Sequence, residues 1–166
     1  MWFADEKSFE QHVASLLRSK LSGTNFVVLD SKKVADVVIC SDDTEPVAFF
    51  LEFKILTPTK NRLGFGDRIG DGFQPEILAK RPKFFERYLR WVLCRCLLPQ
   101  DEDRQFVFAT NAKISEYIMG GTIGDKHNNI RPSIFKREPL LTESELVNSI
   151  LSWLHEPHSK PADASS

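Results

Sequence analysis

The sequence has few cysteines, no long apolar run and almost no net charge, and each absence excludes a class of protein. Its 3 cysteines in 166 residues form neither a disulfide framework nor a zinc-ligand pattern. Cys94 and Cys96 lie in an apolar stretch, so we expect packed, reduced thiols of a cytoplasmic protein. No apolar run approaches the roughly 20 residues that span a membrane, and the first residues do not resemble a signal peptide.

The apolar residues that are present suffice for one packed domain. Hydrophobic residues make up 42% of the chain and include 13 Phe and 3 Trp. A chain of this length can bury a core without disulfides or metal. We therefore expect one domain over residues 1–154. Residues 155–166 are rich in Pro, Ser and Ala and lack an apolar anchor, which predicts a disordered tail.

In the first third of the chain, the apolar spacing predicts a helix followed by three strands. Ser8 and Gln11 resemble a capping box, and apolar residues then recur at helical spacing, so we expect a helix over about residues 8–20. Runs rich in β-forming residues predict strands at 25–29, 34–39 and 47–55. Turn residues between the second and third runs predict a hairpin, which makes these two strands antiparallel.

The rest of the chain alternates further helices and strands. Residues 57–73 show no periodicity and contain four glycines, which predicts a long functional loop. The remaining expected elements are a helix from Pro75 that breaks at Pro82, a long amphipathic helix over 83–98, a strand at 106–109, a short helix at 114–118, an edge strand at 134–135, and a helix from a Thr142–Glu145 capping box to Leu154. The predicted fold class is α/β, with a central mixed sheet of four to five strands flanked by helices.

The third predicted strand carries two charged side chains on one face. Glu52 and Lys54 alternate with the apolar residues Leu51, Phe53 and Ile55. Charged groups in a strand covered on both faces need a partner or a function. A solvent-facing strand with the same alternation is the alternative. A paired carboxylate and ammonium are the groups that a metal-dependent hydrolase places beside a phosphate.

Asp36 adds a second carboxylate to this interpretation. It lies in the otherwise apolar run 34–39, where an ionised carboxylate is unfavourable unless it is paired or bound to metal. An Asp close to a turn that reaches solvent is the alternative. If the second and third strands pair, Asp36 and Glu52 meet at one end of the sheet. Their oxygens are ligands that Mg²⁺ prefers, with Mn²⁺ as a substitute.

Taken in order, the segments Phe9-Glu10, Ala35-Asp36-Val37-Val38 and Leu51-Glu52-Phe53-Lys54 resemble the PD-(D/E)xK nuclease superfamily, whose core is the restriction-endonuclease-like fold. The pattern is similar to that of archaeal Holliday-junction resolvases and related small endonucleases. The resemblance implies a site made of Glu10, Asp36, Glu52 and Lys54, with Asp36 and Glu52 as metal ligands. By itself, Glu10 is equally typical of an exposed acid in the first turn of a helix.

A local excess of positive charge follows the Glu52–Lys54 strand. Residues 57–95 contain nine basic and four acidic side chains, although the net charge of the whole chain is −1. Such a stripe is typical of a surface that tracks phosphates, and a solvated helix face is the alternative. The expected nucleic-acid contacts are Lys60, Arg62, Arg68, Gln74, Lys80, Arg81 and Lys83.

The predicted function is Mg²⁺-dependent hydrolysis of DNA phosphodiester bonds by an endonuclease. A homodimer that cuts two strands is typical of the family that the sequence resembles. Two alternatives stay open: a non-catalytic nucleic-acid- or protein-binding member of the same fold, and a nuclease acting on RNA or on branched DNA.

Overall fold

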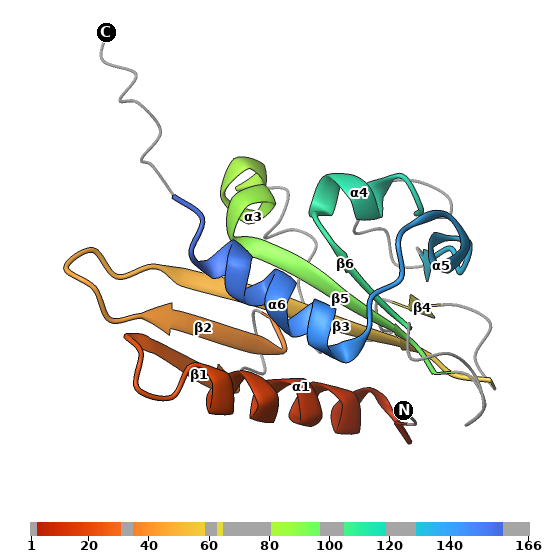
Figure 1. Cartoon of the computed structure of the whole chain (residues 1–166). Helices are drawn as coiled ribbons and strands as arrows, with labels where there is room; N and C mark the ends of the chain where they lie inside the picture. Colours follow the sequence, from red (N-terminus) through yellow and green to blue (C-terminus); the bar gives the residue numbers. More distant parts are fainter. Residues whose placement is uncertain are drawn as a thin grey trace, which may run out of the picture.

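A five-stranded mixed sheet forms the centre of the protein (Figure 1). The computed structural model describes residues 3–30, 35–58, 63–64, 81–96, 105–118 and 129–157. The strands are β1 (Phe26–Asp30), β2 (Val37–Ser41), β3 (Ala48–Leu56), β4 (Leu63–Gly64), β5 (Leu89–Arg95), β6 (Phe106–Ala109) and β7 (Asn129–Ile130). The helices are α1 (Glu6–Lys20), α3 (Pro82–Tyr88), α4 (Asn111–Ser115), α5 (Ile134–Arg137) and α6 (Glu143–Leu154).

The sheet has the order β1-β2-β3-β5-β6. β1, β2 and β3 form an antiparallel meander, which confirms the predicted antiparallel pairing of the second and third strands. β5 lies parallel to β3, and β6 is antiparallel to β5. The predicted α/β class with a mixed sheet of four to five strands is therefore confirmed.

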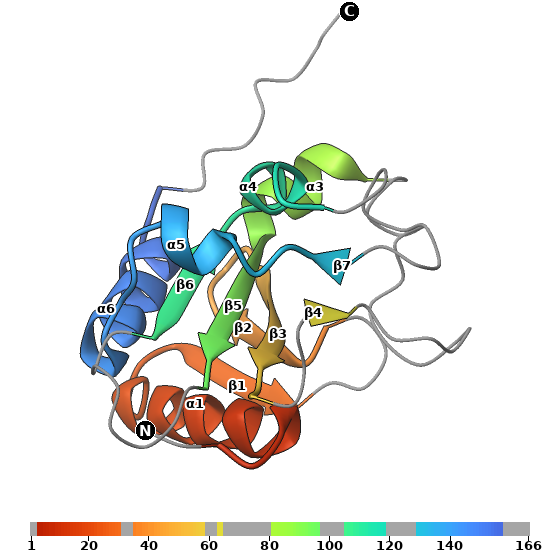
Figure 2. The same cartoon turned by 90° about the vertical axis from the view of Figure 1, so that its right-hand side faces the viewer.

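Helices cover both faces of this sheet (Figures 1 and 2). α1 and α6 pack on one face, where Phe9, Leu17 and Ile150 join a core with Ile39 and Phe53. α3, α4 and α5 contribute to a second core on the opposite face, around Trp91 and Leu93 of β5. Because β5 is buried from both sides, its residues are apolar almost without interruption.

The predicted helix over 83–98 is confirmed as far as Tyr88 and is wrong beyond it. Pro82 occupies the first position of α3, where its missing N–H is not needed. α3 ends at Tyr88, and the chain continues as β5, the strand between β3 and β6. A fully buried strand and a buried helix both appear as a continuous apolar run, so periodicity alone did not separate them.

α1 begins earlier than the sequence pattern indicated. Its N-cap is Asp5, whose carboxylate accepts a hydrogen bond from the Ser8 N–H at 2.7 Å. The Ser8 hydroxyl in turn accepts one from the Asp5 N–H at 3.2 Å. Ser8 is thus the third helical residue of the capping box and not its N-cap. The earlier start adds Glu6 and Lys7 to the helix.

The structure confirms some of the other predicted helices and strands and contradicts others. The strand at 106–109 and the Thr142–Glu145 capping box are confirmed. Residues 134–135 belong to the helix α5 and not to an edge strand. Within the loop expected over 57–73, Leu63 is buried and pairs with Ile130 as part of a small β4–β7 sheet. The helix expected from Pro75 lies outside the described residues.

The cysteines and the residues at the end of α6 were also the subject of predictions. Cys40, Cys94 and Cys96 are free thiols, and the last two are buried, as expected. His155 ends α6, and its ring lies 5.4 Å from that of Phe26. Residues 158–166 of the expected tail lie outside the described residues. None of the described helices is both long and apolar enough to cross a bilayer.

Candidate active site

The candidate site lies where β2 and β3 stop pairing. β2 accompanies β3 only as far as Leu51, opposite Val37, whereas β5 follows β3 to its end at Leu56. Asp36 immediately precedes β2 and lies outside the strand in which the sequence pattern placed it. The second half of β3, which carries Glu52 and Lys54, therefore extends past β2 at the level of Asp36.

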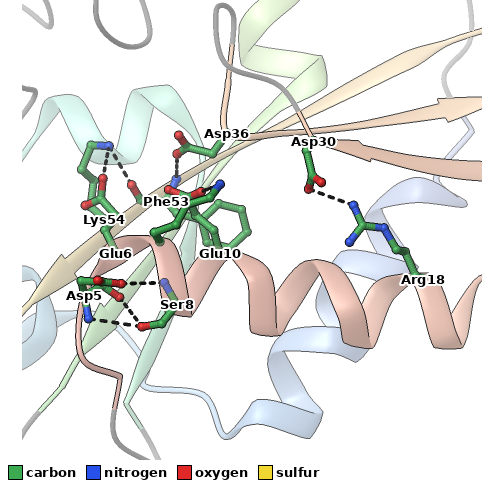
Figure 3. Close-up of polar contacts among 10 residues, drawn as sticks. Asp5, Glu6, Ser8, Glu10, Arg18, Asp30, Asp36, Phe53 and Lys54 are labelled. Atoms are coloured by element: carbon green, nitrogen blue, oxygen red, sulfur yellow. Dashed lines mark hydrogen bonds and ion pairs between the residues drawn. The ribbon is translucent and has the colours of Figure 1, made fainter.

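Asp36 lies next to the part of β3 with which β2 no longer pairs. One oxygen of its carboxylate, Oδ2, accepts a hydrogen bond from the backbone N–H of Phe53 at 2.7 Å (Figure 3). This bond stands in for the ladder bond that a continuing β2 would make. It holds the Asp36 side chain beside β3, between the positions of Glu52 and Lys54 in the chain.

Glu52 and Lys54 form a buried ion pair. Only 3% of Glu52 and 7% of Lys54 is exposed. The Lys54 Nζ lies 2.8 Å from the Glu52 Oε1, donates to the Phe53 carbonyl oxygen at 2.7 Å and lies 3.3 Å from the Glu6 Oε1. The three donors of the ammonium are thereby used. The alternative of a solvent-facing Glu-x-Lys strand is excluded by this burial.

The second oxygen of the Glu52 carboxylate does not form a hydrogen bond with Lys54. The Glu52 Oε2 is buried and has no hydrogen-bond partner in the described part of the chain. A buried carboxylate oxygen without a partner is unfavourable, and native structures contain few of them. A cation or a proton at this oxygen would relieve the penalty.

Burial opposes the charge of Glu52, whereas the surrounding carboxylates support the charge of Lys54. Burial raises the pKa of Glu52 to about 8; the nearby Lys54 opposes this shift and the Asp36 carboxylate adds to it. Burial alone would lower the pKa of Lys54, but Glu52, Glu6 and Asp36 outweigh burial, and the net shift is upward. Lys54 therefore stays protonated at neutral pH.

Glu10, on α1, lies near the Asp36 carboxylate. It is 8% exposed, and its Oε2 lies 2.7 Å from the Nζ of Lys7. Burial raises the pKa of Glu10; Lys7 opposes the shift, and the charge of Asp36 adds to it. Glu10 is thus within electrostatic reach of Asp36, and its carboxylate is held by Lys7. Its burial excludes the alternative of an ordinary exposed first-turn acid.

The sequence analysis missed Glu6 and Lys7. Both are in the first turn of α1, which the predicted start at Ser8 left outside the helix. Glu6 and Glu10 are four residues apart and share a helix face, which is the one turned toward Lys54. The signal that would have found them is the Asp5–Ser8 capping box, with Asp as the N-cap residue.

Asp36 and Glu52 are carboxylates, the ligand type that Mg²⁺ prefers. Among the described residues, no group of three or more His, Cys, Asp or Glu is placed to hold a metal ion. Mg²⁺ is commonly bound by one or two carboxylates and completes its shell with water and substrate phosphate. The chemistry of Asp36 and Glu52 is compatible with such a pair, and the buried Glu52 Oε2 has no hydrogen-bond partner among the described residues.

The expected nucleic-acid contacts are placed only in part. Lys60, Arg62, Arg68, Gln74 and Lys80 lie outside the described residues. Arg81 and Lys83 are exposed at the start of α3. α3 leads into β5 opposite Phe50, toward the beginning of β3, whereas Lys54 lies toward the end of that strand. Arg81 and Lys83 therefore lie toward the beginning of β3, whereas Lys54 lies toward its end.

Comparison with known proteins adds no assignment. No family model matches the sequence, and no curated protein is significantly similar to it.

Proposed function

We propose that this protein is a metal-dependent nuclease of the PD-(D/E)xK type that cuts DNA internally. The observation that carries the proposal is the buried Glu52, with one oxygen on Lys54 and the other without a described partner, beside the Asp36 carboxylate. The element order also supports it: a helix with Glu10, then a strand, then Asp36, then the Glu52–Lys54 strand. This order is the basis for proposing a restriction-endonuclease-like core.

Asp36 and Glu52 would hold the metal ion. A bound Mg²⁺ polarises a phosphoryl oxygen and makes its coordinated water more acidic. The protein's own part is to keep two carboxylates at one end of β3, and the Asp36–Phe53 hydrogen bond does this for Asp36. The second Asp36 oxygen and the Glu52 Oε2 are then the candidate ligand atoms.

Lys54 would act as a cation and not as a base. Its upward pKa shift keeps the ammonium charged at neutral pH, so it has no lone pair to accept a proton. A fixed positive charge beside the phosphate stabilises the negative charge that builds up in the transition state. Glu10 would organise the site through Lys7 and its field on Asp36.

The partner proposed for this site is DNA. Lys60, Arg62, Arg68, Gln74, Lys80, Arg81 and Lys83 are the proposed contacts to the phosphate backbone. Cutting two strands requires two such sites, so we propose a homodimer as the unit that cleaves a duplex. The free thiols are compatible with the reducing cytoplasm, where we place the protein.

A second candidate is a non-catalytic binding module with the same fold. The observation in its favour is that the Lys54 ammonium already has three partners, Glu52, Glu6 and the Phe53 carbonyl oxygen. In this second candidate, the ion pair would hold α1 against β3 and would have no catalytic role. The two candidates differ in whether Lys54 is needed for chemistry or only for stability.

Cleavage assays separate these candidates. Purified protein is incubated with supercoiled plasmid, single-stranded DNA, a four-way DNA junction and RNA, each with Mg²⁺ or with EDTA. We expect cleavage of DNA with Mg²⁺ only, and a loss of about 100-fold or more in the rate for Glu52→Gln and Lys54→Ala. Lys20→Ala, on the exposed end of α1, is the matched control and should cut as the wild type does.

The proposal fails if folded wild type cuts no DNA substrate with Mg²⁺, or if Lys54→Ala and Glu52→Gln cut as well as the control. Cleavage of RNA alone would replace DNA by RNA as the substrate.

A further inference from the structure

The outward side of α3 combines an exposed aromatic ring with basic side chains. Among the described residues, the large apolar side chains that are exposed are Val27, Leu29 and Phe84, and only Phe84 is aromatic, with 42% of its surface exposed. Lys83 and Arg87 are four residues apart, and Phe84 precedes Arg87 by three, so the three side chains are neighbours on the helix surface. We call Lys83, Phe84, Arg87 and Tyr88 the α3 patch.

The ring of Phe84 is held in place by other rings. Its centroid lies 4.8 Å from that of Tyr88, 5.1 Å from that of Phe85 and 6.1 Å from that of Phe50. The Arg87 guanidinium lies over the Tyr88 ring, 5.3 Å from its centroid. An aromatic ring fixed on one side and exposed on the other is a stacking surface that does not need to be ordered upon binding.

Two contacts fix the helix that carries the patch. The Trp153 indole N–H donates to the Arg87 carbonyl oxygen at 3.1 Å, which joins α3 to α6. The Ala112 N–H donates to the Glu86 carboxylate at 2.9 Å, which joins α3 to α4. The acidic side chain within α3 is thus engaged by a backbone donor, next to the two basic side chains.

A hollow lies between α3 and α4. It has a volume of about 540 Å³ and is lined by Pro82, Lys83, Glu86, Arg87 and Ala112. Two of the side chains that line it, Lys83 and Arg87, are cations, and the Glu86 carboxylate accepts a hydrogen bond from the Ala112 N–H. A phosphate group near Lys83 and Arg87 would therefore meet positive charge.

We propose that the α3 patch binds single-stranded nucleic acid, with an unpaired base stacked on Phe84 and the adjoining phosphates at Lys83 and Arg87. Bases within a duplex are stacked on each other and offer no free face, so a ring of this kind selects unpaired bases. An acidic peptide would use the two cations but would leave the ring without a role. Figures 1 and 2 draw α3 on the far side of the sheet from α1. Glu52 and Lys54 lie on the same face of β3 as Phe50, which contacts Phe84, so the patch shares a face of the sheet with these residues and lies toward the beginning of β3.

The choice of nucleic acid as the occupant rests on the proposed nuclease function, and the test therefore measures binding without cleavage. Fluorescence anisotropy in EDTA is recorded with labelled oligothymidylate and oligouridylate of about twelve nucleotides, and with a duplex of equal length. We expect both single strands to bind more tightly than the duplex. We expect Phe84→Leu, which keeps an apolar side chain but removes the ring, to weaken single-strand binding about tenfold.

Phe84→Tyr restores the ring and should bind as the wild type does, which excludes a general folding defect as the cause. Leu29→Ala removes an exposed apolar side chain elsewhere and should leave binding unchanged. Lys83→Ala and Arg87→Ala should each reduce the slope of log affinity against log salt by about 0.7.

Wild-type affinity in Phe84→Leu would overturn the inference, as would tighter binding of the duplex than of either single strand. Competition by polyglutamate that is as strong in Phe84→Leu as in wild type would also overturn it, because it would identify an acidic peptide site. Ring-dependent binding without any cleavage in Mg²⁺ would support the α3 patch and refute the nuclease. Cleavage in Mg²⁺ together with unchanged single-strand binding by Phe84→Leu would support the nuclease and refute the α3 patch.

Discussion

Replacing Glu52 by glutamine should change how the protein's stability depends on pH. Burial raises the pKa of Glu52 from 4.5 to about 8 in the folded protein. A carboxyl group whose pKa is higher in the folded state binds its proton more tightly there. Its contribution to stability is fully present below pH 4.5 and is lost as the pH rises to about 8. A glutamine side chain resembles the protonated acid and is neutral at every pH.

The expected effect is large enough to measure. At about 1.4 kcal/mol for each pH unit between the two pKa values, raising the pH from about 5.5 to about 8 should destabilise the wild type by about 3 kcal/mol relative to Glu52→Gln. Total stabilities of domains are about 5–15 kcal/mol, so this change is a substantial fraction. In the wild type the pKa of Lys54 is raised above 10.5 and lies outside this range.

Urea unfolding in EDTA, at several pH values across this range, measures the difference. We expect the free energies of unfolding of wild type and Glu52→Gln to diverge with increasing pH, with the variant becoming relatively more stable. Both proteins contain Glu10, so its own raised pKa largely cancels in the comparison. Parallel curves would mean that Glu52 is ionised throughout, and would refute the view that burial controls its protonation.

The remaining predictions concern stability at three other positions. Thr142→Ala removes the side-chain acceptor at the start of α6, so it should lower the free energy of unfolding by about 1 kcal/mol and Tm by about 2–4 °C; an unchanged Tm would contradict this. Asp36→Ala leaves the Phe53 N–H without its acceptor and should destabilise the fold by about 1–3 kcal/mol in urea unfolding, and an unchanged free energy of unfolding would contradict this. Glu6→Ala removes a partly exposed partner of Lys54 and should change stability by less than about 1 kcal/mol; a larger loss in thermal unfolding would show that the pair holds α1 in place.

Much of the sheet follows from local patterns in the sequence. β1, β2 and β3 coincide within a few residues with the predicted strands, because runs of β-forming residues bounded by turn residues are a local signal. α6 was found from its capping box, which is a local signal. These features depend on neighbours in the chain, and local patterns are sufficient to reveal them.

β5 could not be predicted, because its secondary structure is decided by distant residues. Its apolar run is equally compatible with a buried helix, and only the presence of β3 and β6 on either side makes it a strand.

The candidate site was predictable in its residues but not in its geometry. Glu52 and Lys54 stood out as charges in an apolar strand, and Asp36 as a carboxylate in an apolar run. Their convergence depends on β2 leaving β3 at Leu51, and no local pattern encodes this. Glu6 was missed because the start of α1 was placed two residues too late.

The proposed chemistry requires a divalent cation at Asp36 and Glu52, and Mn²⁺ binding tests this most directly. Electron paramagnetic resonance counts free Mn²⁺ during a titration of wild type, Asp36→Ala and Lys54→Ala, each checked for folding by circular dichroism. We predict that wild type and Lys54→Ala bind Mn²⁺ and that Asp36→Ala does not, because Asp36 supplies ligand oxygens and Lys54 supplies only charge. Equal binding by wild type and Asp36→Ala, or no binding by wild type, would contradict the proposed site.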